Sequence, residues 1–416
     1  MGDKLLRHGG IIFTASIISY FFAYLFHFYV ARALGPGDYG VLGSILSLLY
    51  IFSVPSIVIT TTLAQIVSEE KSVGEYGRIK SILLLSVKRL AFIGSIIFII
   101  IILLSSFLKV VLDLPTTIPI LTLGFSLIFI TILPSPRGVL QGIQNFTSLG
   151  FNMAIEKPAL LLFALLFIHI GMGVNGAILS YGTAAIVILI LAFLPLKSIL
   201  REESERVNVS IYPYAAPIFI LILCITIMSS IDILFVRKDF PPEVSGYFTA
   251  MKMLGQVIYF SSIALGGVLL PKVSELNISN KKHDFLLRKT LIYFGIILAA
   301  VISTYALAPE LIITTLFGES YAPISRYLVW YAITTGLLST AIILMFYDVS
   351  LKRTAFRYPL TLLTPIQALL LIIFHETLEQ VIIVQAATFT TLLIAVMIIN
   401  RRYNGYLRKD QQVLCE

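Results

Sequence analysis

Long apolar segments dominate this sequence, and they restrict the folds open to it more than any motif does. The chain has 416 residues, of which 58% are hydrophobic and only 12% charged, whereas soluble domains carry about 25% charged residues. So few charged groups cannot cover a surface that faces water, which indicates an integral membrane protein rather than a soluble enzyme. Because a bilayer core of about 30 Å needs roughly 20 apolar residues in a helix, the sequence predicts twelve transmembrane helices: about 10–32, 41–67, 83–108, 117–136, 151–171, 174–196, 212–237, 246–271, 287–307, 323–347, 356–374 and 378–400.

The positions of lysine and arginine predict how these helices are oriented. If the N-terminus is cytoplasmic, most of the 30 Lys and Arg residues, Arg137 among them, fall in cytoplasmic connections. The outer connections then hold five, and two more lie within helices. This asymmetry follows the positive-inside rule. We therefore expect a multi-pass protein of the cell (cytoplasmic) membrane with both termini in the cytoplasm, and the net charge of +8 reflects orientation rather than nucleic-acid binding.

An internal repeat divides the chain near its middle. The stretch Tyr29–Gly40 recurs in altered form at Leu234–Gly246, and a constant offset of 206 residues also aligns Val67-Ser68-Glu69 with Val273-Ser274-Glu275. Repeats of this kind are common in secondary transporters. Because six helices per repeat is an even number, the two repeats are expected to be parallel.

The repeat predicts two halves of six helices each. Residues 1–200 form the N-terminal six-helix lobe, and residues 201–416 form the C-terminal six-helix lobe with a cytoplasmic tail. The charged segment Lys197–Val209 is the expected hinge between them. A short interfacial helix is also expected at 309–317.

Polar residues inside the predicted helices are the candidates for function, because such groups usually face a bundle interior or a wet cavity. Lys252 shares one helical stripe with Thr249, Gln256 and Tyr259. It either snorkels to the outer interface or lines the cavity, and the inward continuation of the stripe favours the cavity. The first repeat has Leu46 at the matching position, so the charge belongs to one half only.

The first helix carries a second polar stripe of Ser16, Tyr20, Tyr24 and His27. Aromatic residues near a helix end often form an interfacial belt. Tyr20 and Ser16 are too deep for a belt, which favours cavity lining.

Three further ionisable groups have two interpretations each. Asp232 lies near the outer end of its helix, where it either pairs with Arg237 or Lys238 or takes part in transport. Glu156 and Lys157 are adjacent, so their side chains point about 100° apart, and they are not expected to form an ideal pair. Snorkelling is at least as good an explanation for these two.

The remaining polar residues predict structure more than chemistry. Gln385 is deep and needs a partner, while hydroxyls in the tenth helix are expected to bond backbone carbonyls or neighbouring helices; these are Thr334, Thr335, Ser339 and Thr340. The sequence contains no P-loop, HExxH, GxSxG or Cys/His cluster. We therefore expect no enzyme activity, no cofactor and no metal site.

Four stretches of the chain carry a family resemblance: ARALGPGDYG at 31–40, SSIDILFVRKDFPPEVSGYFTAMKM at 229–253, PKVSE at 271–275 and LFGESYAPISRYLVWYA at 316–332. These stretches resemble the polysaccharide transporter family, the Wzx-like O-antigen flippases of the MOP superfamily. The resemblance implies a V-shaped, two-lobed bundle whose cationic cavity binds the head of a lipid-linked oligosaccharide, a polyprenyl phosphate or diphosphate sugar. Lys252 is the position that best matches this role, and Arg32 matches the family's arginine before Leu-Gly.

The function that this resemblance implies is translocation of lipid-linked oligosaccharides across the cytoplasmic membrane by alternating access. The expected protein is a monomer, and glycan-assembly enzymes are its candidate protein partners. One alternative is a cation-coupled multidrug or metabolite exporter of the same superfamily, which favours an acidic residue deep in one lobe, and the first half shows none. A second alternative, a non-transporting scaffold for glycan assembly, does not account for the polar stripes.

Overall fold

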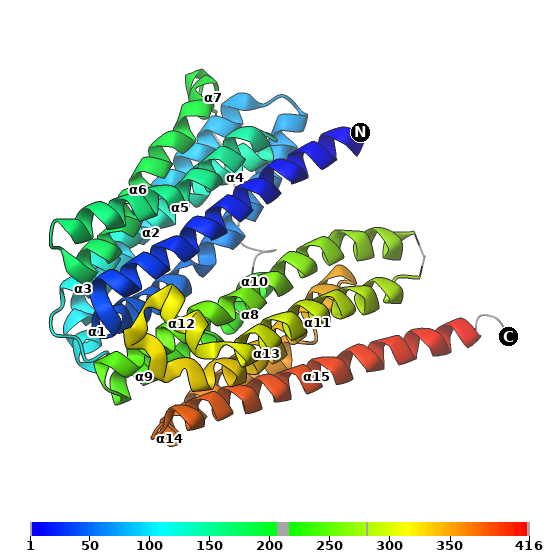
Figure 1. Cartoon of the computed structure of the whole chain (residues 1–416). Coiled ribbons are helices and arrows are strands. Elements are labelled where there is room, and N and C mark those ends of the chain that lie inside the picture. Colours follow the sequence, from blue (N-terminus) through cyan, green and yellow to red (C-terminus); the bar gives the residue numbers. More distant parts are fainter. Residues whose placement is uncertain (1, 206–215, 280–281, 414–416) are drawn as a thin grey trace. The chain divides into compact units, whose positions relative to one another are not determined.

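The computed structural model describes residues 2–205, 216–279 and 282–413 (Figure 1). In these parts of the chain the backbone forms helices and their connections, without a strand. The chain divides into two compact units, Met1–Thr226 and Ile227–Glu416. Residues 206–209 of the expected hinge, and the expected start of the seventh helix at 212, lie outside the described residues.

The first unit begins with a very long helix that is broken once. Helix α1 covers both of the first two predicted transmembrane segments, and its backbone leaves helical geometry at Gly35, with φ of 76°. Glycine tolerates this left-handed conformation because it lacks a Cβ, and Pro36 follows at the first position of the next helical stretch, where its missing N–H costs nothing. The helices of this unit are α1 (Gly2–Ser72), α2 (Tyr76–Val111), α3 (Ile118–Ile132), α4 (Pro134–Gly142), α5 (Phe146–His169), α6 (Gly173–Phe193), η1 (Leu194–Leu196) and α7 (Lys197–Arg201).

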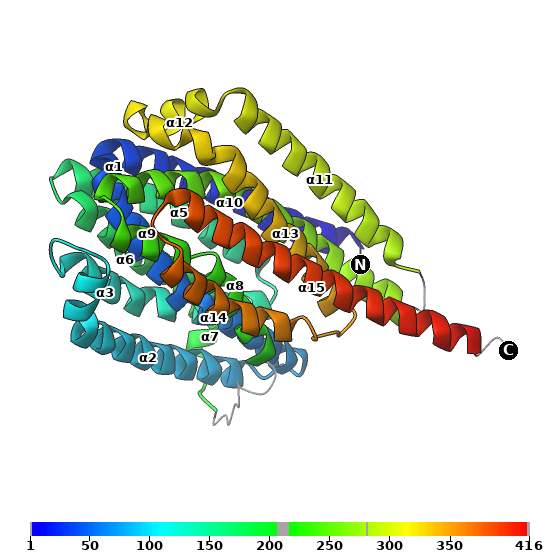
Figure 2. The ribbon, with the colours of Figure 1, turned by 90° about the horizontal axis from the view of Figure 1, so that it is seen from below.

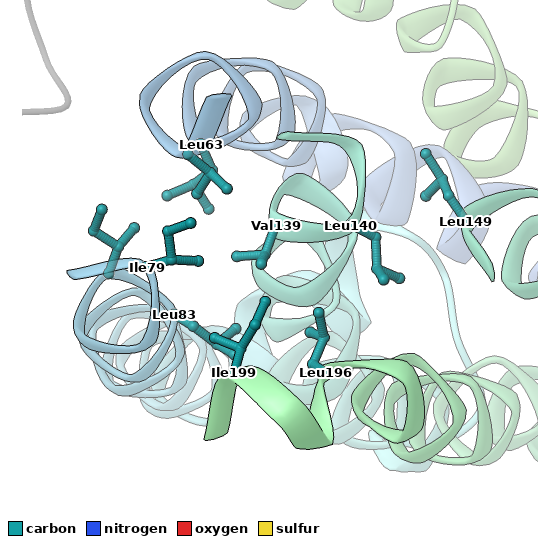
Figure 3. Close-up of a cluster of buried hydrophobic side chains, with 10 residues drawn as sticks. Leu63, Ile79, Leu83, Val139, Leu140, Leu149, Leu196 and Ile199 are labelled. Atoms are coloured by element: carbon teal, nitrogen blue, oxygen red, sulfur yellow. The ribbon is translucent and has the colours of Figure 1, made fainter. Parts of the chain in front are cut away.

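Within this unit α1 packs against α4 and α5, α3 packs against α2 and α6, and α5 packs against α6 (Figures 1 and 2). A buried cluster of branched aliphatic side chains joins six of these elements (Figure 3). Its members include Leu63 from α1, Leu83 from α2, Val139 from α4, Leu149 from α5, Leu196 from η1 and Ile199 from α7. The cluster holds the short helices α4 and α7 against the longer ones.

The second unit is built around α13, which contacts α10, α11 and α15 (Figures 1 and 2). Most of the side chains on α13 are buried, as expected for the central helix of a bundle. Its elements follow the end of α8 (Ala216–Met228) and are α9 (Ile231–Asp239), α10 (Pro242–Ile278), α11 (Asp284–Leu307), α12 (Pro309–Phe317), η2 (Glu319–Tyr327), α13 (Leu328–Ser350), α14 (Arg357–Ile373) and α15 (Leu378–Val413).

The described residues contain 10 helices that are long and apolar enough to span a membrane, and α14 is a shorter apolar helix. The chain is therefore a multi-pass membrane protein, while the count of twelve spans and the two-repeat layout stay predictions. Two expected single helices are interrupted: the segment 117–136 divides into α3 and α4, and the segment 212–237 divides into α8 and α9. The short helix expected at 309–317 is present as α12.

Close packing of α1 against α4 depends on two glycines one turn apart. A Cβ at Gly142 would lie 2.6 Å from Val67 Cβ and 2.8 Å from the Ala64 carbonyl oxygen, and one at Gly138 would lie 2.7 Å from Leu63 Cβ. Small residues at this spacing let two membrane helices approach each other. Backbone and Cβ atoms cannot move aside as the end of a flexible side chain can.

We therefore predict that Gly142→Ala destabilises the first unit by about 1–3 kcal/mol, the usual cost of overpacking. Gly10→Ala is the control, because a Cβ at Gly10 meets nothing within 4 Å. Thermal unfolding of both purified variants in detergent measures the effect. Equal midpoints for the two variants would show that α1 and α4 are not in close contact.

Candidate functional site

A break between α8 and α9 creates the polar centre of the second unit. Helix α8 ends at Met228 and α9 begins at Ile231, so the carbonyls and amides at the break lose their partners within a helix. In a membrane each of these groups must be satisfied by protein. The buried side chain of Gln367 on α14 donates from Nε2 to the Met228 carbonyl at 2.9 Å, and Asp232 Oδ1 accepts from the Ile233 N–H at 2.8 Å.

Asp232 is fully buried and collects polar partners from three other helices. Lys252 Nζ on α10 lies 2.6 Å from Asp232 Oδ1 and forms an ion pair with it. Gln385 on α15 donates from Nε2 to Asp232 Oδ2 at 2.7 Å. The Tyr331 hydroxyl on α13 lies 3.5 Å from the same oxygen, at the outer limit of a hydrogen bond. One carboxylate thus links α9, α10, α13 and α15.

The pairing of opposite charges makes this burial possible. An isolated ion at membrane depth is costly, and an ion pair that is also hydrogen-bonded offsets much of that cost. Lys252 lies ten residues after the start of α10 at Pro242, about 15 Å along the helix axis. Its side chain is 13% exposed, whereas that of Asp232 is 0% exposed. The ammonium group is therefore the more accessible member of the pair.

The structure brings together three residues that the sequence marked separately, namely Lys252, Asp232 and Gln385. Gln385 has the partner that its depth required. Asp232 has in Lys252 a partner that was not expected from the sequence, where Arg237 and Lys238 were its candidates.

The rest of the predicted α10 stripe takes no part in the ion pair. The Thr249 hydroxyl donates to the Ser245 carbonyl of its own helix at 2.8 Å. Gln256 and Tyr259 are half-buried further along α10, where the Tyr259 ring packs edge to face on Phe260. Their assignment to a substrate site stays a prediction.

The stripe predicted on the first helix belongs to the first unit. His27 is buried, and its Nδ1 lies 3.0 Å from the Tyr39 hydroxyl, so the bond spans the break at Gly35. Tyr24 is half-buried, whereas Tyr20 and Arg32 are exposed. These positions remain predicted substrate contacts, and the bond to Tyr39 gives His27 a structural role as well.

The first unit contains a charged cluster that the sequence interpretation missed. Arg137 Nη2 lies 2.7 Å from Glu156 Oε2, and Lys157 Nζ lies 2.7 Å from Glu156 Oε1. The expectation that Glu156 and Lys157 do not form an ideal pair was therefore wrong, because a long lysine side chain reaches back to its neighbour. Arg137 had been assigned to a cytoplasmic connection, but it lies within α4.

One signal in the sequence predicts part of this cluster. The connection between α4 and α5 lies at residues 143–145. Arg137 precedes the end of α4 by five residues, and Asn152 follows the start of α5 by six. Residues at nearly equal distances from the turn of a helical hairpin lie opposite each other, and here Arg137 Nε donates to Asn152 Oδ1 at 2.8 Å.

The hydroxyls of α13 mostly bond within their own helix. Thr334, Thr335 and Thr340 each donate to the carbonyl four residues earlier, as expected. The expectation fails for Ser339, whose buried hydroxyl has no hydrogen-bond partner in the described part of the chain. The residues that the structure describes also include no group of three His, Cys, Asp or Glu able to hold a metal ion.

Comparison with solved structures identifies the fold. The chain is similar to a multidrug resistance MATE family transporter of the MOP superfamily in an inward-facing conformation, with a TM-score of 0.77 and 13% identity over 93% of this chain and 95% of the other. It is similar to the lipid II flippase MurJ, with a TM-score of 0.70 and 12% identity over 94% and 87%. It is also similar to a MOP superfamily transporter from Pyrococcus furiosus, with a TM-score of 0.66 and 16% identity over 97% and 96%.

The long apolar helices and this likeness define a multi-pass membrane protein with the fold of MOP superfamily transporters. More particularly, the chain belongs to the polysaccharide biosynthesis protein family, whose model matches residues 5–277. This confirms the family resemblance predicted from the sequence. No curated protein sequence matches the chain significantly.

We predict that the buried ion pair of Asp232 and Lys252 stabilises the second unit. Asp232→Asn or Lys252→Met alone should each destabilise the protein by about 3–5 kcal/mol, because each leaves a buried group without its partner. The double variant should recover much of this loss, since both charges are then gone. Thermal unfolding of the wild type and the three variants gives the coupling energy. Strictly additive losses would contradict a direct interaction.

Proposed function

We propose that this protein is a flippase that moves lipid-linked oligosaccharides across the cytoplasmic membrane by alternating access of its two lobes. The family match supports a role in polysaccharide biosynthesis. The likeness to a lipid II flippase supports a fold able to move a lipid with a large polar head. Secondary transporters with repeated bundles commonly rock one lobe against the other around a central site.

The physical problem of such a substrate lies in its head rather than its tail. Each sugar hydroxyl costs several kcal/mol in hydrocarbon when it lacks a hydrogen-bond partner, and an isolated phosphate costs far more. A polyprenyl tail is apolar and meets no such barrier. The protein therefore has to offer polar and cationic groups at membrane depth while the tail stays in lipid.

The observation that carries the proposal is the buried pair of Lys252 and Asp232. Well-packed apolar residues often replace a buried ion pair at no loss of stability, so a pair at this depth favours a role beyond packing. In the proposed mechanism Lys252 binds the substrate phosphate or diphosphate through its accessible ammonium. Asp232 is its counter-ion in the absence of substrate, and Gln385 holds that carboxylate in position.

The other predicted contacts have supporting roles in this proposal. Thr249, Gln256 and Tyr259 on α10, together with Tyr20, Tyr24, His27 and Arg32 on α1, offer hydrogen bonds and ring faces to sugar. We propose that both termini are cytoplasmic, that the protein acts as a monomer, and that no cofactor takes part.

One observation favours the alternative of a cation-coupled exporter. Glu156 lies ten residues after the start of α5, which is further into this membrane helix than the predicted helix start at 151 indicated. Both oxygens of Glu156 are, however, bonded to cations, Oε2 to Arg137 and Oε1 to Lys157. A carboxylate held in this way attracts a cationic substrate poorly, which leaves the flippase as the better proposal.

We predict that purified protein in liposomes exposes a lipid-linked oligosaccharide to an impermeant glycosidase, and that Lys252→Ala abolishes this exposure. Lys272→Ala is the matched control, because Lys272 lies exposed on the same helix. Asp232→Asn/Lys252→Met separates function from folding, since it removes the ammonium without leaving a lone buried charge. If that double variant is folded and flips normally, Lys252 does not bind the substrate. Efflux of a soluble cation without lipid flipping would support the exporter instead.

A further inference from the structure

We propose that the first unit carries its own binding site for a phosphate-class anion, formed by Arg137 on α4 and Lys157 on α5. Glu156 keeps the two cations together when the site is empty, and it competes with the incoming anion. The ligand class rests on the proposed function, since the head of a lipid-linked sugar contains phosphate. The site itself rests on the geometry and the charge of the cluster.

The geometry suits an oxyanion. Glu156 receives one cation on each of its oxygens, Arg137 at Oε2 and Lys157 at Oε1, both at 2.7 Å. Two oxygens of a phosphate group are spaced much like those of a carboxylate. Cations arranged to hold one are therefore arranged to hold the other through charge-assisted hydrogen bonds, at which arginine is especially effective.

The charges of the cluster do not balance. Over residues 2–205, 216–279 and 282–413, Glu156 is the only carboxylate within 4.0 Å of Arg137 or Lys157. Two cations thus share one anion, whereas in the second unit Lys252 and Asp232 pair one to one. An unbalanced charge away from bulk water is unfavourable. A bound anion would neutralise it, so the charge favours ligand binding in the first unit.

The cluster is also reachable, unlike the carboxylate of the second unit. The side chains of Arg137, Glu156 and Lys157 are 18%, 23% and 27% exposed, while that of Asp232 is 0% exposed. A ligand can therefore reach the side chains of Arg137 and Lys157.

Neighbouring groups hold the two cations in position. Asn152 accepts from Arg137 Nε at 2.8 Å, and its own Nδ2 donates to the Ile188 carbonyl of α6 at 2.8 Å. The Lys157 ammonium lies 5.7 Å from the centre of the Tyr181 ring. Binding groups that are fixed beforehand lose less conformational entropy when a ligand arrives.

A purely structural cluster and an anion site predict opposite effects of Glu156→Gln. If the cluster only joins α4 to α5, loss of the carboxylate weakens the fold and does nothing for anions. If Glu156 competes with a ligand, Glu156→Gln frees both cations and tightens anion binding.

The experiment measures equilibrium binding of radiolabelled inorganic pyrophosphate and of farnesyl diphosphate to the full-length protein in nanodiscs of neutral phosphatidylcholine. We expect the wild type to bind, Lys157→Gln to bind about tenfold more weakly, as for loss of one hydrogen bond to a charged group, and Lys157→Arg to retain binding. Glu156→Gln should bind several-fold more tightly. Lys88→Gln is the matched control, because Lys88 lies exposed on α2 of the same unit.

Binding of both probes would indicate recognition of the anion itself, and binding of farnesyl diphosphate alone would indicate a lipid headgroup. The proposal is overturned if neither probe binds, if Lys157→Gln binds as the wild type does, or if a folded Glu156→Gln protein binds no more tightly. Binding that depends on Lys157 without flipping in liposomes would retain this site and reject the flippase. Flipping without such binding would do the reverse.

Discussion

The cost of placing a charge in a medium that cannot solvate it governs the polar architecture of this protein. Inside a bilayer no water solvates an ion, so the ion needs either a partner in the protein or contact with a polar ligand. Both units meet this constraint with a carboxylate that a lysine contacts directly, Asp232 with Lys252 and Glu156 with Lys157. The charged groups are few, so each of them has to be explained by its partners.

The two units apply this solution differently, and the difference has a structural cause. Asp232 lies at the start of α9, beside a break in the helix, where free amide groups and the positive end of the helix dipole favour a carboxylate. One lysine is enough there, and the carboxylate is fully buried. Glu156 lies in the interior of α5 without such a helix end, and two cations surround it. The first unit is consequently left with excess positive charge and with side chains that a ligand can reach.

Breaks in the helices determine the positions of the buried polar groups as much as the helices themselves do. Gly35 divides α1 and lets His27 meet Tyr39, and the break after Met228 lets Gln367 bond a backbone carbonyl. Broken helices at membrane depth are tolerated where protein groups satisfy the freed backbone. The Gly-Pro-Gly run in the sequence predicted the break at Gly35. The break between α8 and α9 has no glycine or proline at its centre, and for this reason it was not predicted.

The amino-acid sequence by itself determined the membrane setting, the approximate positions of the long helices and the family. It also marked Lys252, Asp232 and Gln385 as polar residues in membrane helices whose presence needs explanation. These features follow from local composition and spacing, which a chain carries before it folds. Only the tertiary structure decided that these three residues meet, because Gln385 is 153 residues from Asp232 and the packing of α9 against α15 brings them together. It likewise decided that Arg137 belongs to a partly buried charged cluster with Glu156 and Lys157. Whether a charged residue lies in a loop or in a helix depends on where the helix ends, and α4 continues to Gly142, past the end of the predicted apolar segment at 136.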